Sequence, residues 1–160
     1  EPDDGLFDVL LIGDLTKRDL MVTLPKIFRG KHLPHPKAEV LRGARVTVDG
    51  GAREGRMHDV VVAVGRYFGG GMMILPEAEP DDGLFDVLLI GDLTKRDLLQ
   101  TLPKTYRGKH LPHPKAEVLR GAVVTVDADE PLPIELDGEQ PGTTPASFEI
   151  VPRALRVRVP

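Results

Sequence analysis

The sequence has 160 residues, a formal net charge of −4 at pH 7 and no cysteine. Its length suits one folded domain over residues 1–160, and its ordinary apolar and charged fractions argue against disorder. Interspersed acids and bases argue against a nucleic-acid partner, the lack of cysteine excludes disulfides and thiolate chemistry, and no apolar run approaches the roughly 20 residues of a membrane-spanning helix. We therefore expect a soluble protein of the cytoplasmic type.

Residues 1–49 and 79–127 carry nearly the same sequence, whereas residues 50–78 and 128–160 are not repeated. Three of the differences place an apolar side chain in the first repeat where the second has a polar one, which is typical of a helix adapted to burial. We interpret the repeat as a recent or deliberate duplication, engineered or recombined, with a natural tandem duplication as the alternative. The five differing pairs among 49 positions are Met21 and Leu99, Val22 and Gln100, Ile27 and Thr105, Phe28 and Tyr106, and Arg45 and Val123.

The first repeat predicts a strand followed by a helix. Leu6–Gly13 is apolar on both faces except for Asp8, which is typical of a central or doubly covered strand. Thr16 then has the position of a helix N-cap, and Asp19, three residues later, completes a capping box. Pro25 interrupts the helical spacing, so we expect either a kink there or one short helix followed by another, with the end at Gly30.

Strands and turns fill the middle of the chain. Lys31–Lys37 contains two prolines and predicts an irregular loop. Ala38–Gly51 is strand-like, and Met57–Val64 is predicted to form a hairpin with Ala44–Asp49 across a seven-residue loop. Met72–Leu75 predicts a further short strand.

The second repeat predicts the same succession, with its helix at about Thr94–Arg107. Beyond the repeat, Leu132–Asp137 predicts a strand and Gly138–Pro145 a loop rich in proline, glycine and threonine. Ser147–Val151 and Ala154–Val159 predict two short strands. This succession favours an α+β fold, a mainly antiparallel β-sandwich or distorted barrel with two helices, one in each repeated strand-helix-strand unit.

The glycine run Gly69–Gly71 has two interpretations. It would bind phosphate if its amides formed a cradle, but it lacks the GK[ST] sequence of a P-loop and does not open a predicted helix. We therefore expect a tight turn.

Two further motifs occur once in each repeat. A pair of histidines has the spacing of metal ligands, but it lies in the proline-rich loop without a third ligand nearby, so we expect no metal there. A pair of aspartates offers oxygen ligands for a cation, but glycine follows it at the entrance to a strand, which favours a turn. These residues are His32, His35, His110 and His113, and the pairs Asp3-Asp4 and Asp81-Asp82.

The second half of the chain contains a specific series of motifs. GRYFGGGMMILPEAEPDDGLFDVLLI begins at Gly65, RGKHLPHPKAEVLRGA at Arg107 and PIELDGEQPG at Pro133. In this order they resemble the C-terminal β-rich domain of bacterial diacylglycerol kinase and sphingosine kinase-like lipid kinases. The resemblance covers about Arg45–Pro160 directly, and residues 1–44 through the repeat.

The resemblance implies one half of a two-domain enzyme. Such kinases bind nucleotide through a GGDGT motif in an N-terminal domain, a motif that these 160 residues do not contain, while the C-terminal sandwich closes the cleft and helps to hold the lipid. The family's DGE motif matches Asp137-Gly138-Glu139. The resemblance implies that Glu139 takes the proton from the lipid hydroxyl during phosphoryl transfer. We expect no bound cofactor, and ATP and Mg²⁺ only if the chain acts as a kinase.

Two residues depart from the family pattern. Val64 stands where an asparagine is usual, and Met73 stands where a basic or polar residue is common, so both make a cleft surface apolar. We therefore predict an engineered or recombined structural domain without catalysis, in which Asp137 and Glu139 are vestigial. The alternative is a lipid-binding fragment of such a kinase that needs a separate nucleotide-binding domain. The partners we consider are a lipid and a second copy of the chain. The side chains predicted to be buried are Val22, Ile27, Phe28, Val64 and Met73.

Overall fold

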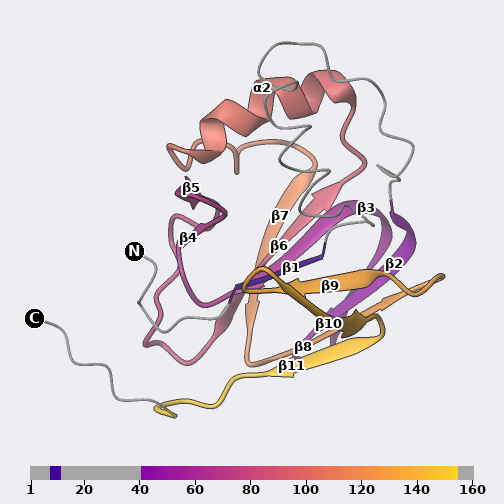
Figure 1. Cartoon of the computed structure of the whole chain (residues 1–160), viewed down its shortest axis with the longest axis vertical. Coiled ribbons are helices and arrows are strands. Elements are labelled where there is room, and N and C mark those ends of the chain that lie inside the picture. The colour runs from indigo at the N-terminus through magenta and orange to yellow at the C-terminus, as the bar shows by residue number, and fades with distance from the viewer. Residues whose placement is uncertain (1–7, 12–40, 155–160) are drawn as a thin grey trace, which may run out of the picture.

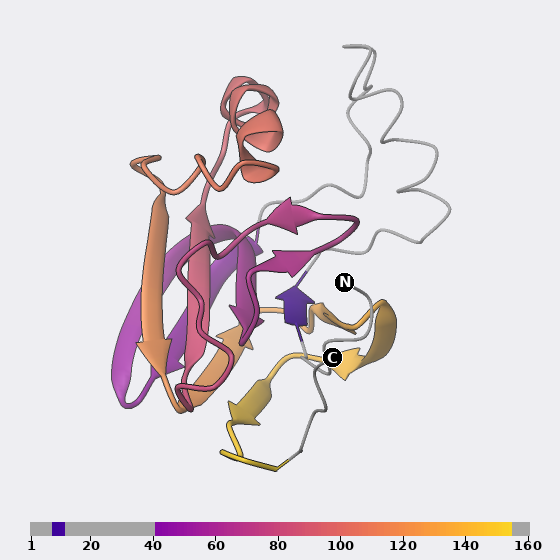
Figure 2. The same cartoon turned by 90° about the vertical axis from the view of Figure 1, so that its left-hand side faces the viewer.

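The computed structural model describes residues 8–11 and 41–154, which form a mostly antiparallel β structure with one helix (Figure 1). Helix α2 lies between β6 and β7 in the chain and sits at one end of these strands (Figure 2). The elements in chain order are β1 (Asp8–Leu11), β2 (Leu41–Val48), β3 (Gly51–Ala63), β4 (Tyr67–Phe68), β5 (Met72–Met73), β6 (Phe85–Gly91), α2 (Lys95–Thr105), β7 (Ala116–Gly121), β8 (Val123–Ala128), β9 (Pro133–Leu136), β10 (Glu139–Thr143) and β11 (Ala146–Glu149).

Strand β3 is the centre of the large sheet. Its first half pairs with β2, and its second half pairs with β1 on one edge and β6 on the other. The strand order is β10-β9-β1-β3-β2-β8-β11, with β6 and β7 attached through β3. The sheet is open, so the expected antiparallel, sandwich-like architecture is present and the distorted barrel is not.

Two apolar clusters cover opposite faces of β3 and β6. The larger includes Val62 of β3 and Val87 of β6, both fully buried, and extends to residues of β2, β8 and β9. The smaller includes Val61 and Leu88 and packs against Ile74 and its neighbours. Because consecutive residues of a strand point to opposite faces, β6 is apolar on both sides. This confirms the doubly covered strand predicted for the second repeat.

The two repeats occupy different places in the sheet. β1 and β6 carry the same sequence and flank β3 in the same register, so that Val62 pairs with Val9 on one edge and with Val87 on the other. Residues 46–48 of β2 and 124–126 of β8 also have the same sequence, and they pair with each other, so that Thr47 faces its counterpart Thr125. The described strands of the two repeats therefore belong to one sheet.

Helix α2 confirms the helix predicted at about Thr94–Arg107. The Thr94 hydroxyl accepts a hydrogen bond from the Asp97 amide, and the Asp97 carboxylate accepts one from the Thr94 amide, which completes the expected capping box. These bonds, with the Lys115 ammonium, lower the pKa of Asp97 to about 2. Pro103 lies in the last turn, where its missing amide hydrogen leaves the Leu99 carbonyl without the usual donor four residues later, and the helix ends at Thr105.

The connection between β2 and β3 differs from the prediction. The strands form the expected hairpin, but the turn is the two residues Asp49 and Gly50, with φ of 45° and 85°. Asp-Gly favours such two-residue turns because glycine adopts positive φ without strain. Residues 51–56 are exposed and extend β3, so they lack the apolar alternation that would have identified them as strand.

The segment Gly138–Pro145 was expected to be a loop, but it contains strand β10. Pro141 is tolerated because, among the described strands, β10 pairs with β9 alone, and a bulge between Glu139 and Gly142 accommodates a residue without an amide hydrogen. The short strand expected at Met72–Leu75 is confined to Met72 and Met73. Val64 and Met73 are half-buried rather than buried, since they lie at a strand end and in the small β4–β5 hairpin.

Several predictions fall outside the described residues. They concern the helix of the first repeat, so the described part of the chain has one helix where two were expected for the whole. Also outside are the loop Lys31–Lys37, nearly all of Ala154–Val159 and the burial of Val22, Ile27 and Phe28.

The smaller cluster predicts a large stability difference between two leucines. Leu88 is fully buried in β6, whereas Leu99 is 41% exposed on α2. Leu88→Ala should lower the free energy of unfolding by about 2–5 kcal/mol, because it leaves a cavity. Leu99→Ala should change it by less than about 0.5 kcal/mol. Urea unfolding followed by circular dichroism measures both, and equal losses would show that Leu88 is not a core residue.

Candidate functional site

The motif Asp137-Gly138-Glu139 forms the end of the β9–β10 hairpin. Asp137 and Gly138 have φ of 48° and 82° and make the two-residue turn, and Glu139 begins β10 opposite Leu136. The Glu139 side chain is exposed. The hairpin joins the sheet through β1, since β9 pairs with β1 at Leu136 and Glu135.

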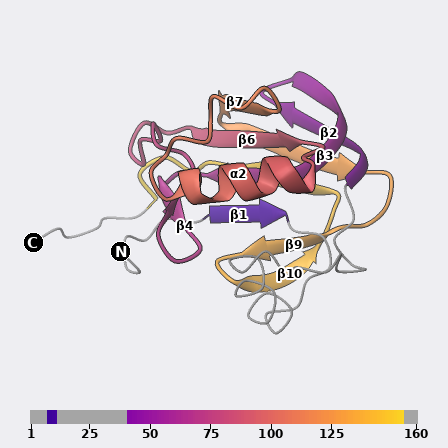
Figure 3. The same ribbon diagram turned by 90° about the horizontal axis from the view of Figure 1, so that it is seen from above.

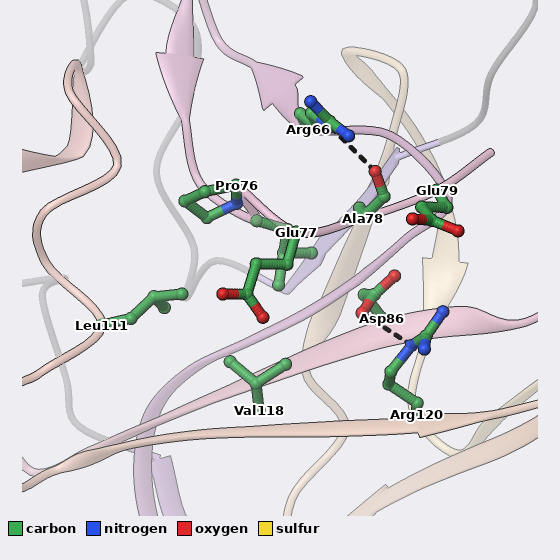
Figure 4. A pocket seen from close by; sticks show the side chains of 10 residues that line it. Arg66, Pro76, Glu77, Ala78, Glu79, Asp86, Leu111, Val118 and Arg120 are labelled. Atoms are coloured by element: carbon green, nitrogen blue, oxygen red, sulfur yellow. Dashed lines mark hydrogen bonds and ion pairs between the residues drawn. The ribbon is translucent and has the colours of Figure 1, made fainter.

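A cleft of about 650 Å³ lies on another part of the molecule, between the outer face of β6–β7 and the segment that follows β5 (Figure 4). Its volume is in the range of small-molecule sites. Apolar and charged side chains both line it, on the segment after β5 and on β7 alike. The lining residues are Arg66, Leu75, Pro76, Glu77, Ala78, Glu79, Asp86, Leu111, Val118 and Arg120.

Asp86 is the buried polar group of this cleft. It faces Arg120 across β6 and β7, and one carboxylate oxygen lies 3.2 Å from the Arg120 Nε. Its other oxygen, Oδ2, is buried and lacks a hydrogen-bond partner within the described part of the chain. Burial raises the pKa of Asp86, and the nearby carboxylates of Glu77 and Glu79 raise it further. Asp86 is therefore a buried acid beside the cleft whose ionised form is disfavoured.

The two arginines of the cleft bind to groups of the protein itself. Arg66 donates from Nε to the Ala78 carbonyl at 2.9 Å, which fixes the segment after β5. Arg120 also pairs with Asp82, in the turn before β6. The partners of the two guanidinium groups are therefore the Ala78 carbonyl and the carboxylates of Asp82 and Asp86, and the exposed Glu77 and Glu79 are not among them.

The structure does not bring the predicted catalytic residues and the cleft together. Asp137 and Glu139 are absent from the cleft lining. They belong to the β9–β10 hairpin, whereas Asp86 and Arg120 of the cleft belong to β6 and β7, which lie on the other side of β1 and β3 (Figure 3). The chain thus offers two separate candidate sites.

The histidines of the second repeat have structural contacts. His110 is buried and its Nε2 donates to the Ile74 carbonyl at 2.9 Å, while burial lowers its pKa. His113 accepts a hydrogen bond from the Lys115 amide at 3.2 Å. In residues 8–11 and 41–154 no group of three or more His, Cys, Asp or Glu side chains is arranged to hold a metal ion.

The turn interpretations are confirmed where the structure describes them. Gly69–Gly71 connects β4 to β5 in a small hairpin. Asp82 accepts a hydrogen bond from the Leu84 amide at 2.8 Å, so the acidic pair of the second repeat belongs to a turn. No helix in the described segments is long and apolar enough to cross a membrane.

The sequence did not lead us to predict Asp86 as a site residue, nor the hydrogen-bonded pair His58 and Asp59. The signal for Asp86 was present, because it is the single charge in an otherwise apolar strand, as its counterpart Asp8 is in the first repeat. His58 and Asp59 lie at a bulge in β3, with Nδ1 and Oδ2 2.7 Å apart. This hydrogen bond raises the pKa of His58, and burial raises that of Asp59.

The carboxylates of Glu77 and Glu79 affect the pKa of Asp86, and this effect can be tested. Glu77→Gln or Glu79→Gln should lower the pKa of Asp86, because each removes a negative charge that disfavours its ionised form. Carbon-13 NMR of the carboxyl resonances against pH measures this pKa. Glu130→Gln, an exposed change outside the cleft, is the matched control and should leave it unchanged. An upward shift in the Glu77 or Glu79 variants would contradict the electrostatic assignment.

Comparisons with known proteins place this architecture in a family. A family model described as the YegS C-terminal NAD kinase beta sandwich-like domain matches residues 1–57 and again residues 44–159. A diacylglycerol kinase from Staphylococcus carnosus is 26% identical over 116 residues, which are 72% of this chain and 38% of that protein. A diacylglycerol kinase from Mycobacterium tuberculosis H37Rv is 30% identical over 95 residues, 59% of this chain and 30% of that protein.

The likeness extends to solved structures. The crystal structure of a diacylglycerol kinase from Bacillus anthracis superposes with a TM-score of 0.60 at 18% identity, covering 92% of this chain and 46% of that one. The chain therefore spans less than half the length of each of these relatives. Because the family model matches most of the sequence, this protein belongs to the family of the YegS C-terminal NAD kinase beta sandwich-like domain.

Proposed function

We propose that this chain is the lipid-side portion of a diacylglycerol kinase-type enzyme and that Glu139 is its general base. The family membership and the named relatives support the enzyme class. The position of Glu139 carries the assignment of the base. Its carboxylate is exposed immediately after a hairpin turn, on a short strand, where a lipid hydroxyl and a separate domain can approach it.

The proposed chemistry is a proton transfer coupled to phosphoryl transfer. Glu139 accepts the proton of the lipid hydroxyl as the hydroxyl oxygen bonds to the γ-phosphorus of ATP and the bond to the ADP oxygen breaks. The 160 residues contain no GGDGT sequence, so the groups that hold ATP and Mg²⁺ come from a nucleotide-binding domain. In this proposal the chain contributes the base and the lipid-facing surface.

The catalytic proposal is tested by supplying that domain. The nucleotide-binding part of the S. carnosus diacylglycerol kinase is mixed with this chain, ATP, Mg²⁺ and vesicles that contain diacylglycerol, and phosphatidic acid is measured. Glu139→Gln should lower the rate at least about 100-fold, since it removes general-base catalysis. Glu149→Gln, an exposed glutamate in β11, is the matched control and should keep the rate.

Two outcomes would contradict the proposal. An unchanged rate in the Glu139→Gln protein would remove Glu139 from the reaction. No phosphatidic acid above background from the unaltered chain would favour the alternative, a structural domain without catalysis whose repeat was introduced by engineering or recombination.

The cleft favours a second candidate function, which is binding of an amphipathic lipid without catalysis. Leu75, Leu111 and Val118 offer apolar contacts for an acyl chain, and the exposed carboxylates of Glu77 and Glu79 can accept a hydrogen bond from a hydroxyl of the headgroup. This binding needs no nucleotide-binding domain, so it can be measured on the chain alone.

Two exposed valines allow lipid binding in the cleft to be distinguished from non-specific binding to vesicles. Val118 lies in the cleft and Val123 lies outside it, and they are 39% and 42% exposed. Val118→Asp should reduce co-sedimentation with diacylglycerol-containing vesicles at least severalfold, because it places a charge beside the apolar side chains of the cleft. Val123→Asp should leave the bound fraction unchanged. Equal effects of the two changes would show that the cleft is not the lipid site.

A further inference from the structure

Strand β1 occupies a slot between two other strands. It pairs with β3 from Asp8↔Ala63 to Leu11↔Val60, and with β9 at Val9↔Leu136 and Leu10↔Glu135. In Figure 3, β1 separates β9 and β10 from the rest of the sheet. Without β1, the edges of β3 and β9 would carry unpaired amides and carbonyls that readily bind another strand.

The other edge of β3 already binds the same strand sequence. Residues 8–11 and 86–89 both read DVLL, and each segment pairs with Val60–Ala63 in the same register and the same antiparallel direction. The second half of β3 is therefore suited to this sequence on both sides. The slot beside β9 binds a strand through backbone hydrogen bonds. These bonds are the same whether the strand comes from the same molecule or from a second copy.

The connection from β1 to β2 is long. Residues 12–40 number 29 by sequence, and a fully extended chain of this length would reach about 95–105 Å. A compact domain of 160 residues has a radius of gyration of only about 15 Å. The length of the connection therefore allows β1 to reach the same slot in a neighbouring molecule.

We propose that the slot between β3 and β9 is a strand-acceptor site whose partner is β1 of a second copy of this chain. Two molecules exchange β1, and each receives the strand that it gives up, as in other domain-swapped dimers. A tethered strand has an effective concentration of the order of millimolar. The chain therefore keeps its own β1 in dilute solution and exchanges it when folding occurs at comparable protein concentrations.

A free peptide tests the slot. The full chain with Val9→Pro and Leu11→Pro loses β1 pairing, because proline cannot donate to the ladder and these two residues face the same edge. This chain should bind a fluorescent peptide with the sequence of residues 6–13, and the unaltered chain should bind it at least about tenfold more weakly because its own strand competes. A peptide carrying the same two prolines is the matched control and should not bind.

The unaltered chain supplies the second test. It is refolded from denaturant at micromolar and at near-millimolar concentration, and the species are then diluted and measured by light scattering. A dimer that forms only at high concentration supports the proposal when it is absent for a Val9→Pro, Leu11→Pro chain that circular dichroism shows to be folded. No dimer from the unaltered chain, or a dimer that persists with both prolines present, would overturn it.

Discussion

The pairing of β3 on both edges is the constraint on which the rest of the structure depends. Val60–Ala63 are at most 1% exposed, so their backbone groups have no access to water and need partners on each side. β6 supplies one set of partners and β1 the other, while the first half of β3 continues into the hairpin with β2. Both apolar clusters and the candidate catalytic hairpin are positioned by this strand.

Strands with the same repeated sequence take different positions in the sheet. The sequence of a strand favours β pairing, but it does not determine which strand becomes its neighbour. β1 and β6 both pair with β3, whereas β2 and β8 pair with each other around Thr47 and Thr125. Apolar, β-branched strands fit several positions in a sheet, and their neighbours decide which one they take. A sequence that is repeated almost exactly therefore does not imply two equal structural units.

Local signals were predictable from the sequence, and contacts between distant residues were not. The cap at Thr94 and the turn at Gly69–Gly71 depend on neighbouring residues, so both were recognised. The exposed start of β3 lacks the alternation of apolar and polar residues that predicts a strand. Pro141 led us to predict a loop where β10 lies. The site formed by Asp86 and Arg120 joins residues 34 positions apart, and only the pairing of β6 with β7 brings them together.

The first repeat has a specific structural role in this arrangement. The family match over residues 44–159 includes all described strands except β1 and the first residues of β2. β1 is the strand that connects β9 to β3, so the attachment of the Glu139 hairpin depends on residues outside that match. The Asp86 cleft, by contrast, is built entirely from residues within it. Loss of β1 pairing would therefore disturb the candidate general base while leaving the residues that form the cleft in their own strands.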